Sequence, residues 1–260
     1  MKATKALVAG AVLAMATTAS ATPSTADWTP ATTYVQPFLV PHLTYDTYFT
    51  EKGQLTPDYG LTIGVLPFDK LQAEVGFDIF TPGFYKDSFQ LNAKLVVPEN
   101  AYGDWQPGVS LGIQSVGFKK DVSNYDHLHL TVGKTFGFGN VSVGGYYGAG
   151  SKALYTSSKG KEERAGFMAS YTSPDIHVGA AGLDKILVVA DYASGNNFFG
   201  AYGAGVAFYF TPAIDVIMGP VLMNDKALFG GNQLYWTVQL DVDFDLRAPP
   251  PPAPAAPAPK

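Results

Sequence analysis

The segment from Leu234 to Asp245 alternates between apolar and polar side chains at every position. One face carries Leu234, Trp236, Val238, Leu240, Val242 and Phe244, and the other carries Tyr235, Thr237, Gln239, Asp241, Asp243 and Asp245. A period of two over about twelve residues is typical of a β-strand and does not fit a helix. Strands of soluble sheets usually run for about five or six residues, whereas a bilayer crossing takes about nine to eleven. The length therefore favours a strand that crosses a membrane.

The same alternation recurs along the chain in pairs of segments. Residues 57–66 and 71–81 flank a short turn, and such hairpins are the repeating unit of an up-and-down barrel. We expect about twelve strands, at residues 34–49, 57–66, 71–81, 89–97, 108–118, 126–135, 141–149, 165–172, 185–193, 200–210, 213–222 and 233–244. Connections 98–107 and 173–184 are longer than this pattern favours, so ten strands is the alternative. The predicted fold class is all-β, a single antiparallel up-and-down transmembrane β-barrel.

The predicted connections alternate between short turns and longer polar loops, a habit of bacterial outer-membrane barrels, whose long loops face outward. Aromatic side chains concentrate near the predicted strand ends, for example Tyr48, Tyr59 and Trp236 at the long-loop end and Phe68 and Phe136 at the other. This distribution resembles the aromatic girdles at the two membrane interfaces. Strands of soluble proteins are also rich in aromatic residues, so these positions support a membrane barrel only together with the alternation.

The two ends of the chain predict export. Residues 1–21 combine a basic start, an apolar stretch and a small-residue cleavage site, which together indicate a secretory signal peptide. We expect residues 22–33 to form an N-terminal periplasmic segment, residues 34–246 the barrel, and residues 247–260 a Pro/Ala-rich extended tail. The predicted location is the cell outer membrane, with both termini in the periplasm.

Composition excludes several classes of protein. The formal net charge of −5, which becomes about −7 without Lys2 and Lys5, disfavours nucleic acid as a partner. The chain has no Cys, which excludes disulfide scaffolds and Cys-ligated metals. No cofactor is expected.

The inward faces of the predicted strands are acidic. The expected lumen and selectivity residues are Asp58, Glu74, Asp78, Lys94, Asp191, Asp215, Asp241 and Asp243. Charges that faced lipid would cost several kcal/mol at mid-bilayer, which is an independent reason to place them inside. Rings of carboxylates favour cations over anions. The alternative is that these groups have no selectivity role and only bind lumen water and one another.

The support in the sequence for catalysis or metal binding is weaker than that for a barrel. His127 and His129 share one face of a predicted strand, so a His-x-His metal site is one hypothesis and a polar lumen wall is the other. Outer-membrane phospholipases are also twelve-stranded barrels with a Ser-His-Asn arrangement, but no convincing set of these residues appears. No phosphate-binding glycine loop appears either. We therefore do not predict an enzyme.

The chain from Tyr34 to Phe244 resembles a Gram-negative outer-membrane β-barrel of the small porin type. The stretch Asp184–Asn197 and the Gly- and aromatic-rich strand Phe199–Phe210 are similar to a poorly characterised group of such proteins. The last strand resembles the signal that the barrel-assembly machinery reads, which implies roles there for Val238, Leu240, Val242 and Phe244. Most such proteins end at the terminal aromatic, whereas a tail follows it here.

These features predict a porin or channel for passive diffusion of ions and small hydrophilic solutes, with a mild cation preference. The alternative is a structural or interaction barrel with a plugged lumen that docks a partner through the Pro/Ala tail or the outer loops. The expected partners are outer-membrane lipids, the barrel-assembly machinery, small solutes or ions, and a periplasmic partner for the tail.

Overall fold

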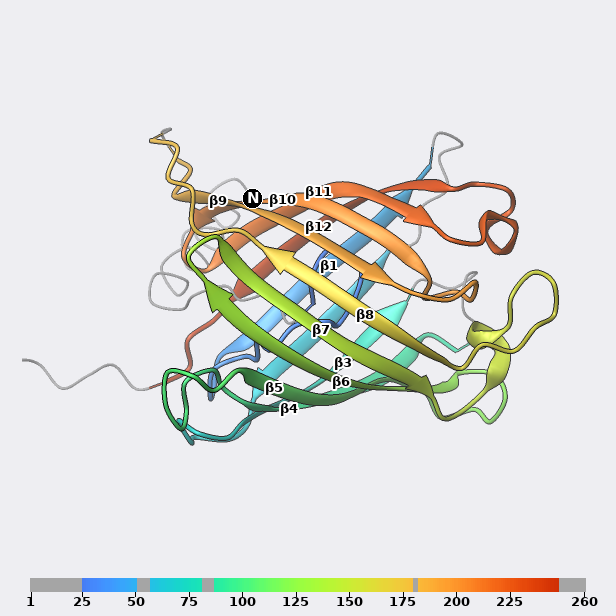
Figure 1. Cartoon of the computed structure of the whole chain (residues 1–260), viewed down its shortest axis with the longest axis horizontal. Helices are drawn as coiled ribbons and strands as arrows, with labels where there is room; N and C mark the ends of the chain where they lie inside the picture. The colour runs from blue at the N-terminus through green and yellow to red at the C-terminus, as the bar shows by residue number, and fades with distance from the viewer. Residues whose placement is uncertain (1–24, 51–56, 81–86, 180–181, 248–260) are drawn as a thin grey trace, which may run out of the picture.

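Twelve antiparallel strands close into a single barrel in the computed structural model (Figure 1). The structure describes residues 25–50, 57–80, 87–179 and 182–247. The predicted signal peptide and nearly all of the predicted tail lie outside the described residues. Within the described part of the chain, no helix is long and apolar enough to cross a membrane.

The strands follow one another around the barrel in chain order. They are β1 Pro41–Phe49, β2 Asp58–Gly64, β3 Gln72–Phe80, β4 Phe89–Val97, β5 Gly108–Val116, β6 Asn124–Phe136, β7 Gly139–Gly148, β8 Ala165–Thr172, β9 Lys185–Ala193, β10 Ala201–Thr211, β11 Ile214–Met223 and β12 Leu234–Asp243. The prediction of an all-β, up-and-down barrel is therefore confirmed, with twelve strands and not ten. Two short 3₁₀ helices, η1 Lys152–Tyr155 and η2 Lys226–Phe229, lie in the long connections.

The start of the first strand differs from the prediction. Residue 34 was expected to begin it, but β1 begins at Pro41. Pro37 has no N–H to give to a ladder, and Leu39 adopts a left-handed backbone with φ 57° that turns the chain into β1. Residues 25–37 therefore lie outside the strands, and Phe38 makes a single parallel bridge to Gly64 at the end of β2.

The barrel closes where β1 pairs with β12. Leu43 lies opposite Val242 and Tyr45 opposite Leu240, and the other edge of β1 pairs with β2. Closure leaves no free sheet edge, which is the condition for a sheet to span a bilayer.

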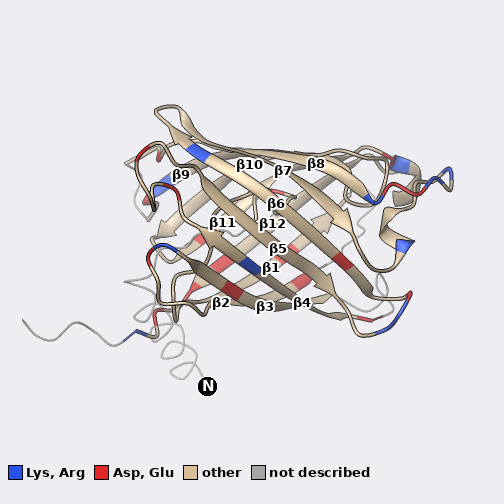
Figure 2. Ribbon diagram, turned by 60° about the horizontal axis from the view of Figure 1, so that its bottom comes forward, with Lys and Arg blue, Asp and Glu red and all other residues tan. Residues whose placement is uncertain are grey.

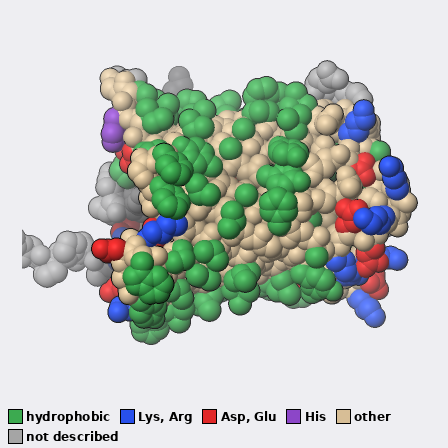
Figure 3. Space-filling model, in the orientation of Figure 1, with side chains coloured by type: hydrophobic (Ala, Val, Ile, Leu, Met, Phe, Trp, Pro, Cys, Tyr) green, Lys and Arg blue, Asp and Glu red, His purple; other side chains and the backbone are tan. Residues whose placement is uncertain are grey.

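Apolar side chains cover the outer wall. On β12, Leu234, Trp236 and Leu240 point outward, and Thr237 and Gln239 between them are buried inside. Charged side chains gather at the two ends of the barrel, while its flank shows apolar side chains (Figure 3). Tyr59 and Phe68 are exposed near opposite ends, as the girdle pattern predicts. Tyr48 is an exception, because it lines an internal cavity.

The inner wall is polar and carries charge on the strands themselves. Asp and Glu occur along several strands, whereas most Lys and Arg lie in connections at the two ends (Figure 2). Their position inside the closed barrel keeps these groups away from lipid, where each charge would cost several kcal/mol.

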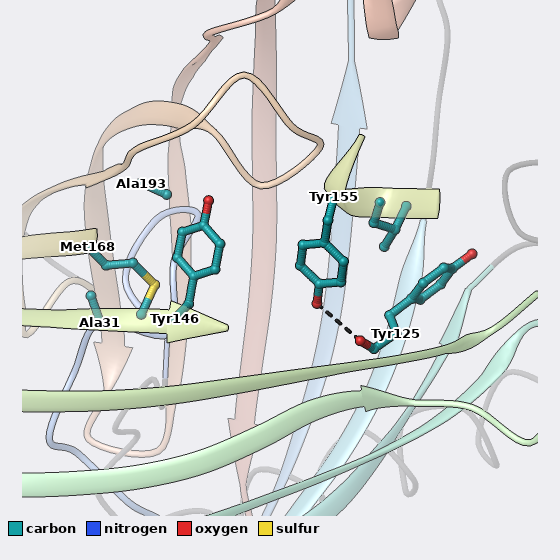
Figure 4. Packing of buried hydrophobic residues seen from close by; sticks show 7 residues of the cluster. Ala31, Tyr125, Tyr146, Tyr155, Met168 and Ala193 are labelled. Atoms are coloured by element: carbon teal, nitrogen blue, oxygen red, sulfur yellow. Dashed lines mark hydrogen bonds between the residues drawn. The ribbon is translucent and has the colours of Figure 1, made fainter. Parts of the chain in front are cut away.

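The long connection between β7 and β8 folds back into one side of the barrel. Tyr155 of η1 is fully buried in a cluster with Tyr125, Tyr146 and Met168 (Figure 4). The Tyr155 hydroxyl donates to the carbonyl of Tyr125 over 3.2 Å, and the Tyr146 hydroxyl donates to the carbonyl of Ser194 over 2.7 Å. This packing fills the lumen next to β6–β9 near the long-loop end.

Candidate functional site in the barrel lumen

The segment of residues 25–40, named here the lumen segment, runs inside the barrel. Its residues Asp27, Thr29, Ala31 and Gln36 are each at most 1 % exposed, because they face the inner wall on several sides. Residues 22–33 were predicted to lie in the periplasm, but the described part of that stretch, from residue 25, contacts the inner wall of the barrel. The physical reason is that this backbone finds hydrogen-bond partners among the polar side chains of the lumen.

Asp191 of β9 holds the outer part of the lumen segment. Its Oδ2 atom accepts hydrogen bonds from the backbone N–H groups of Trp28, at 2.8 Å, and Thr29, at 2.6 Å. The Trp28 indole N–H also donates to the carbonyl of Phe199, and Gln239 donates to the carbonyl of Asp27. Hydrogen bonds to a carboxylate are about twice as strong as neutral ones, so Asp191 is a principal anchor.

A buried ion pair holds the inner part of the lumen segment. Glu74 and Lys94 face each other on β3 and β4, with Nζ 3.8 Å from Oε1. The other carboxylate oxygen of Glu74 accepts the N–H of Gln36 at 2.7 Å, and Lys94 donates to the carbonyl of Tyr34 at 2.9 Å. The two charges therefore bind the segment as well as each other.

Hydroxyl groups from two further strands complete the contact. Ser110 of β5 donates to the carbonyl of Thr32, and Ser170 of β8 donates to the carbonyl of Ala31. The lumen segment is thus held from several sides of the barrel at once.

The lumen segment leaves two cavities. The outer cavity, of about 230 Å³, opens beside β1–β4 and β12 toward the long-loop end and is lined by residues such as Asp46, Asp58 and Tyr48. The inner cavity, of about 200 Å³, lies beside β8–β11 and is lined by residues such as Tyr34 and Lys185. Thr25 borders both cavities, so the segment is the partition between them.

Carboxylates from three neighbouring strands line the outer cavity. Asp46 and Asp58 lie directly opposite each other on β1 and β2, and Asp78 lies on β3, opposite Gly60 of β2. Like charges at directly opposed positions destabilise a sheet. Thr44 donates to Asp46 and Asn92 donates to Asp78, while one oxygen of Asp58 has no partner among the described residues.

A second carboxylate group surrounds His42 nearer the short-turn end. Its Nε2 lies 3.1 Å from Asp241 and its Nδ1 lies 2.7 Å from Asp243. Both nitrogens find acceptors, which suits an imidazole that donates from both. Asp215, also predicted for the lumen, is fully buried, and neither of its oxygens has a partner among the described residues.

His127 and His129 both point inward, but their surroundings differ. His127 is stacked among aromatic rings, with its centroid 4.2 Å from that of Phe199 and 5.0 Å from that of Tyr146. His129 lines the outer cavity, and the two imidazole centroids are 6.3 Å apart. No group of three metal-ligating side chains occurs in the described ranges, so the geometry gives the metal hypothesis no third ligand.

All eight predicted lumen residues lie on the inner wall, and further lumen residues, among them Asp46, Asp27 and Trp28, were not predicted. Asp46 follows His42 and Thr44 at the same period of two, so this alternation could have revealed it. Asp27 and Trp28 belong to a stretch with no periodic pattern, and no local signal could have placed them in the lumen.

A closed antiparallel barrel with an apolar outer wall and a charged inner wall is the architecture of outer-membrane β-barrels. The described residues of this chain have that architecture, with twelve strands in a closed barrel.

Comparisons with known proteins add the following. No protein-family model matches the sequence, and no curated protein is significantly similar to it. The fold is similar to an outer membrane channel from Pseudomonas putida F1, with a TM-score of 0.44 and 12 % identity over 83 % of this chain and 99 % of that one. It is also similar to a triple mutant of the Rh. blastica porin, with a TM-score of 0.38 and 7 % identity over 79 % of this chain and 99 % of that one. Likenesses at this level carry no argument about function.

Proposed function

We propose that this protein is an outer-membrane channel for small cations and small hydrophilic solutes, narrowed by its own lumen segment. The main observation in support of a channel is the outer cavity. It has a volume of about 230 Å³ and is lined by carboxylates from several strands of the closed barrel. A catalytic role has no comparable support among the described residues.

The cation preference is argued from the balance of charge at the outer cavity. Its described lining includes the carboxylates of Asp46, Asp58 and Asp78, against the ammonium of Lys94 and the imidazoles of His42 and His129. His42 is already engaged by Asp241 and Asp243. Lys94 is already engaged by Glu74 and the lumen segment. The excess of negative charge attracts cations and repels anions.

The test is conductance of the purified, folded barrel in a planar bilayer under a KCl gradient. We expect small discrete steps with a reversal potential on the cation-selective side. The double variant Asp58→Asn with Asp78→Asn should move the reversal potential toward zero, because it removes two carboxylates from the cavity. Asp215→Asn, a buried carboxylate that does not line the outer cavity, is the matched control and should change selectivity less. Anion selectivity in the unaltered protein would contradict the proposal.

A barrel with a closed lumen is the second candidate. The observation in its favour is the number of strands that hold the lumen segment, among them β3, β4, β5, β8, β9 and β12. An inserted barrel that conducts no ions would support this candidate, in which the outer loops or the tail dock a partner.

The proposed orientation places the short connections and both termini in the periplasm, since long loops of such barrels face outward. For assembly, Val238, Leu240 and Val242 lie on the outward face of β12, with Phe244 directly after the strand. We propose that the assembly machinery recognises this face.

A further inference from the structure

We propose that the outer cavity binds a short aliphatic diamine, a chain of methylene groups with an ammonium at each end. This deepens the proposed function by naming a solute class for the same lumen. The cavity is lined by both carboxylates and aromatic rings, which match the two chemical parts of such a molecule.

The acidic side spans four adjacent strands. Asp241 of β12, Asp46 of β1, Asp58 of β2 and Asp78 of β3 all line the cavity. Because neighbouring strands are about 4.8 Å apart, these positions spread over roughly 14 Å, more than a single ammonium group can reach. Two ammonium groups joined by a few methylenes can meet two carboxylates of this row at once.

Unused acceptors at the same cavity point independently to a hydrogen-bond donor as ligand. His129 is 4 % exposed and lines the cavity, yet its Nδ1 has no partner among the described residues. One oxygen of Asp58, which also lines the cavity, has no such partner either. Buried acceptors without donors are costly, and an ammonium group supplies three donors.

Aromatic side chains also line the cavity. Trp28 of the lumen segment and Tyr48 of β1 form an edge-to-face pair with centroids 5.3 Å apart, and Phe199 and Phe229 from two outer loops also line the cavity. Such rings pack against methylene groups and attract cations through their faces. A bare metal ion would use only the acidic side.

The volume of about 230 Å³ limits the size of the ligand. A four-carbon diamine fits this space, whereas a folded peptide does not.

The test is isothermal titration calorimetry of the full-length folded barrel in detergent with putrescine, and with 1-butylamine as the single-charge analogue. We expect saturable binding of putrescine that is at least tenfold tighter than that of 1-butylamine. This comparison uses the unaltered protein and so does not depend on the folding of a variant. Equal affinity for the two amines, or no saturable binding of putrescine, would overturn the proposal.

A variant then locates the site. Asp46→Asn with Asp58→Asn should weaken putrescine binding at least tenfold, and Asp175→Asn, at the inner cavity, should leave it within about twofold. Equal losses in both proteins would overturn the location. The KCl conductance measurement separates the two proposals: conduction without putrescine binding leaves only the channel, and binding without conduction leaves only the diamine site.

Discussion

At the scale of single residues, Asp191 connects the barrel wall to the lumen segment. One of its oxygens accepts two backbone N–H groups from the segment, those of Trp28 and Thr29. No other side chain described above accepts two backbone hydrogen bonds from the segment, so its removal should act on the segment before it acts on the barrel.

Replacing Asp191 with Ala should loosen the outer part of the lumen segment. Two buried N–H groups would lose their acceptor, at a cost of about 1–3 kcal/mol each. We expect faster chymotrypsin cleavage next to Trp28 and Tyr34 while the barrel stays folded. Asp215→Asn is the control, and an unchanged cleavage rate in Asp191→Ala would show that other contacts hold the segment.

The contributions of Glu74 and Lys94 to the stability of the barrel should depend strongly on each other. Lys94→Met leaves a buried carboxylate without its cation, which costs about 3–5 kcal/mol in other buried pairs. The double variant Glu74→Gln with Lys94→Met removes both charges, so its loss should be smaller than that of Lys94→Met alone. The measurement is thermal unfolding followed by the heat-dependent shift in gel migration. Additive losses would mean that the two charges act independently.

At the scale of elements, β12 shows how alternation separates lipid from lumen. Leu240 is 38 % exposed on the outer wall, while Gln239 and Asp241 on either side are each 3 % exposed. A one-residue shift in register would exchange these environments for the whole strand.

Leu240→Arg should therefore impair assembly. An arginine on the lipid face costs about 2–4 kcal/mol near the bilayer midplane. We expect less folded barrel in outer-membrane fractions and in refolding with lipid vesicles. Leu240→Val keeps an apolar surface and serves as the control, and normal insertion of the Arg variant would place this position away from lipid.

The outer loops should respond to acid through Glu163. The backbone N–H of Asn196, which donates to Glu163 at 2.7 Å, and the Lys161 ammonium hold the pKa of this carboxyl below its ordinary value. Such a group stabilises the loop contact above its ordinary pKa, and the contact weakens as pH falls through the lowered value. We expect hydrogen exchange at Asn196 to be slower than in Glu163→Gln at pH 6. The difference should vanish in strong acid, and a constant difference would contradict this role.

At the scale of the whole molecule, the lumen segment decides how much of the barrel interior is open. Removal of residues 25–36 joins the outer and inner cavities, which the segment now separates. It also leaves Asp191, Glu74 and Lys94 without their bonds to the segment.

A protein without residues 25–36 should conduct more and unfold more easily. We expect single-channel conductance to increase severalfold, and the midpoint of thermal unfolding to fall because buried charges lose partners. Planar-bilayer recording and the gel-migration assay measure the two effects. Unchanged conductance would mean that the segment does not limit the pore.

Much of the fold could be predicted from the sequence because each strand has its own alternating pattern of apolar and polar residues. The predicted strands 89–97, 165–172 and 185–193 coincide with β4, β8 and β9 at both ends. A period of two fixes both the strand and its inward face, so the lumen positions of Glu74 and Asp191 could be predicted from local pattern alone.

The sequence by itself determined the barrel, because a transmembrane strand must separate lipid-facing from lumen-facing residues at every second position. Only the tertiary structure decided what fills the lumen. Residues 25–40 have no periodic pattern, and their place depends on partners far along the chain, such as Asp191 and Gln239. Backbone hydrogen bonds to such distant side chains leave no pattern in the local sequence, so residues 25–33 were predicted as part of a periplasmic segment and residues 34–40 as part of the first strand.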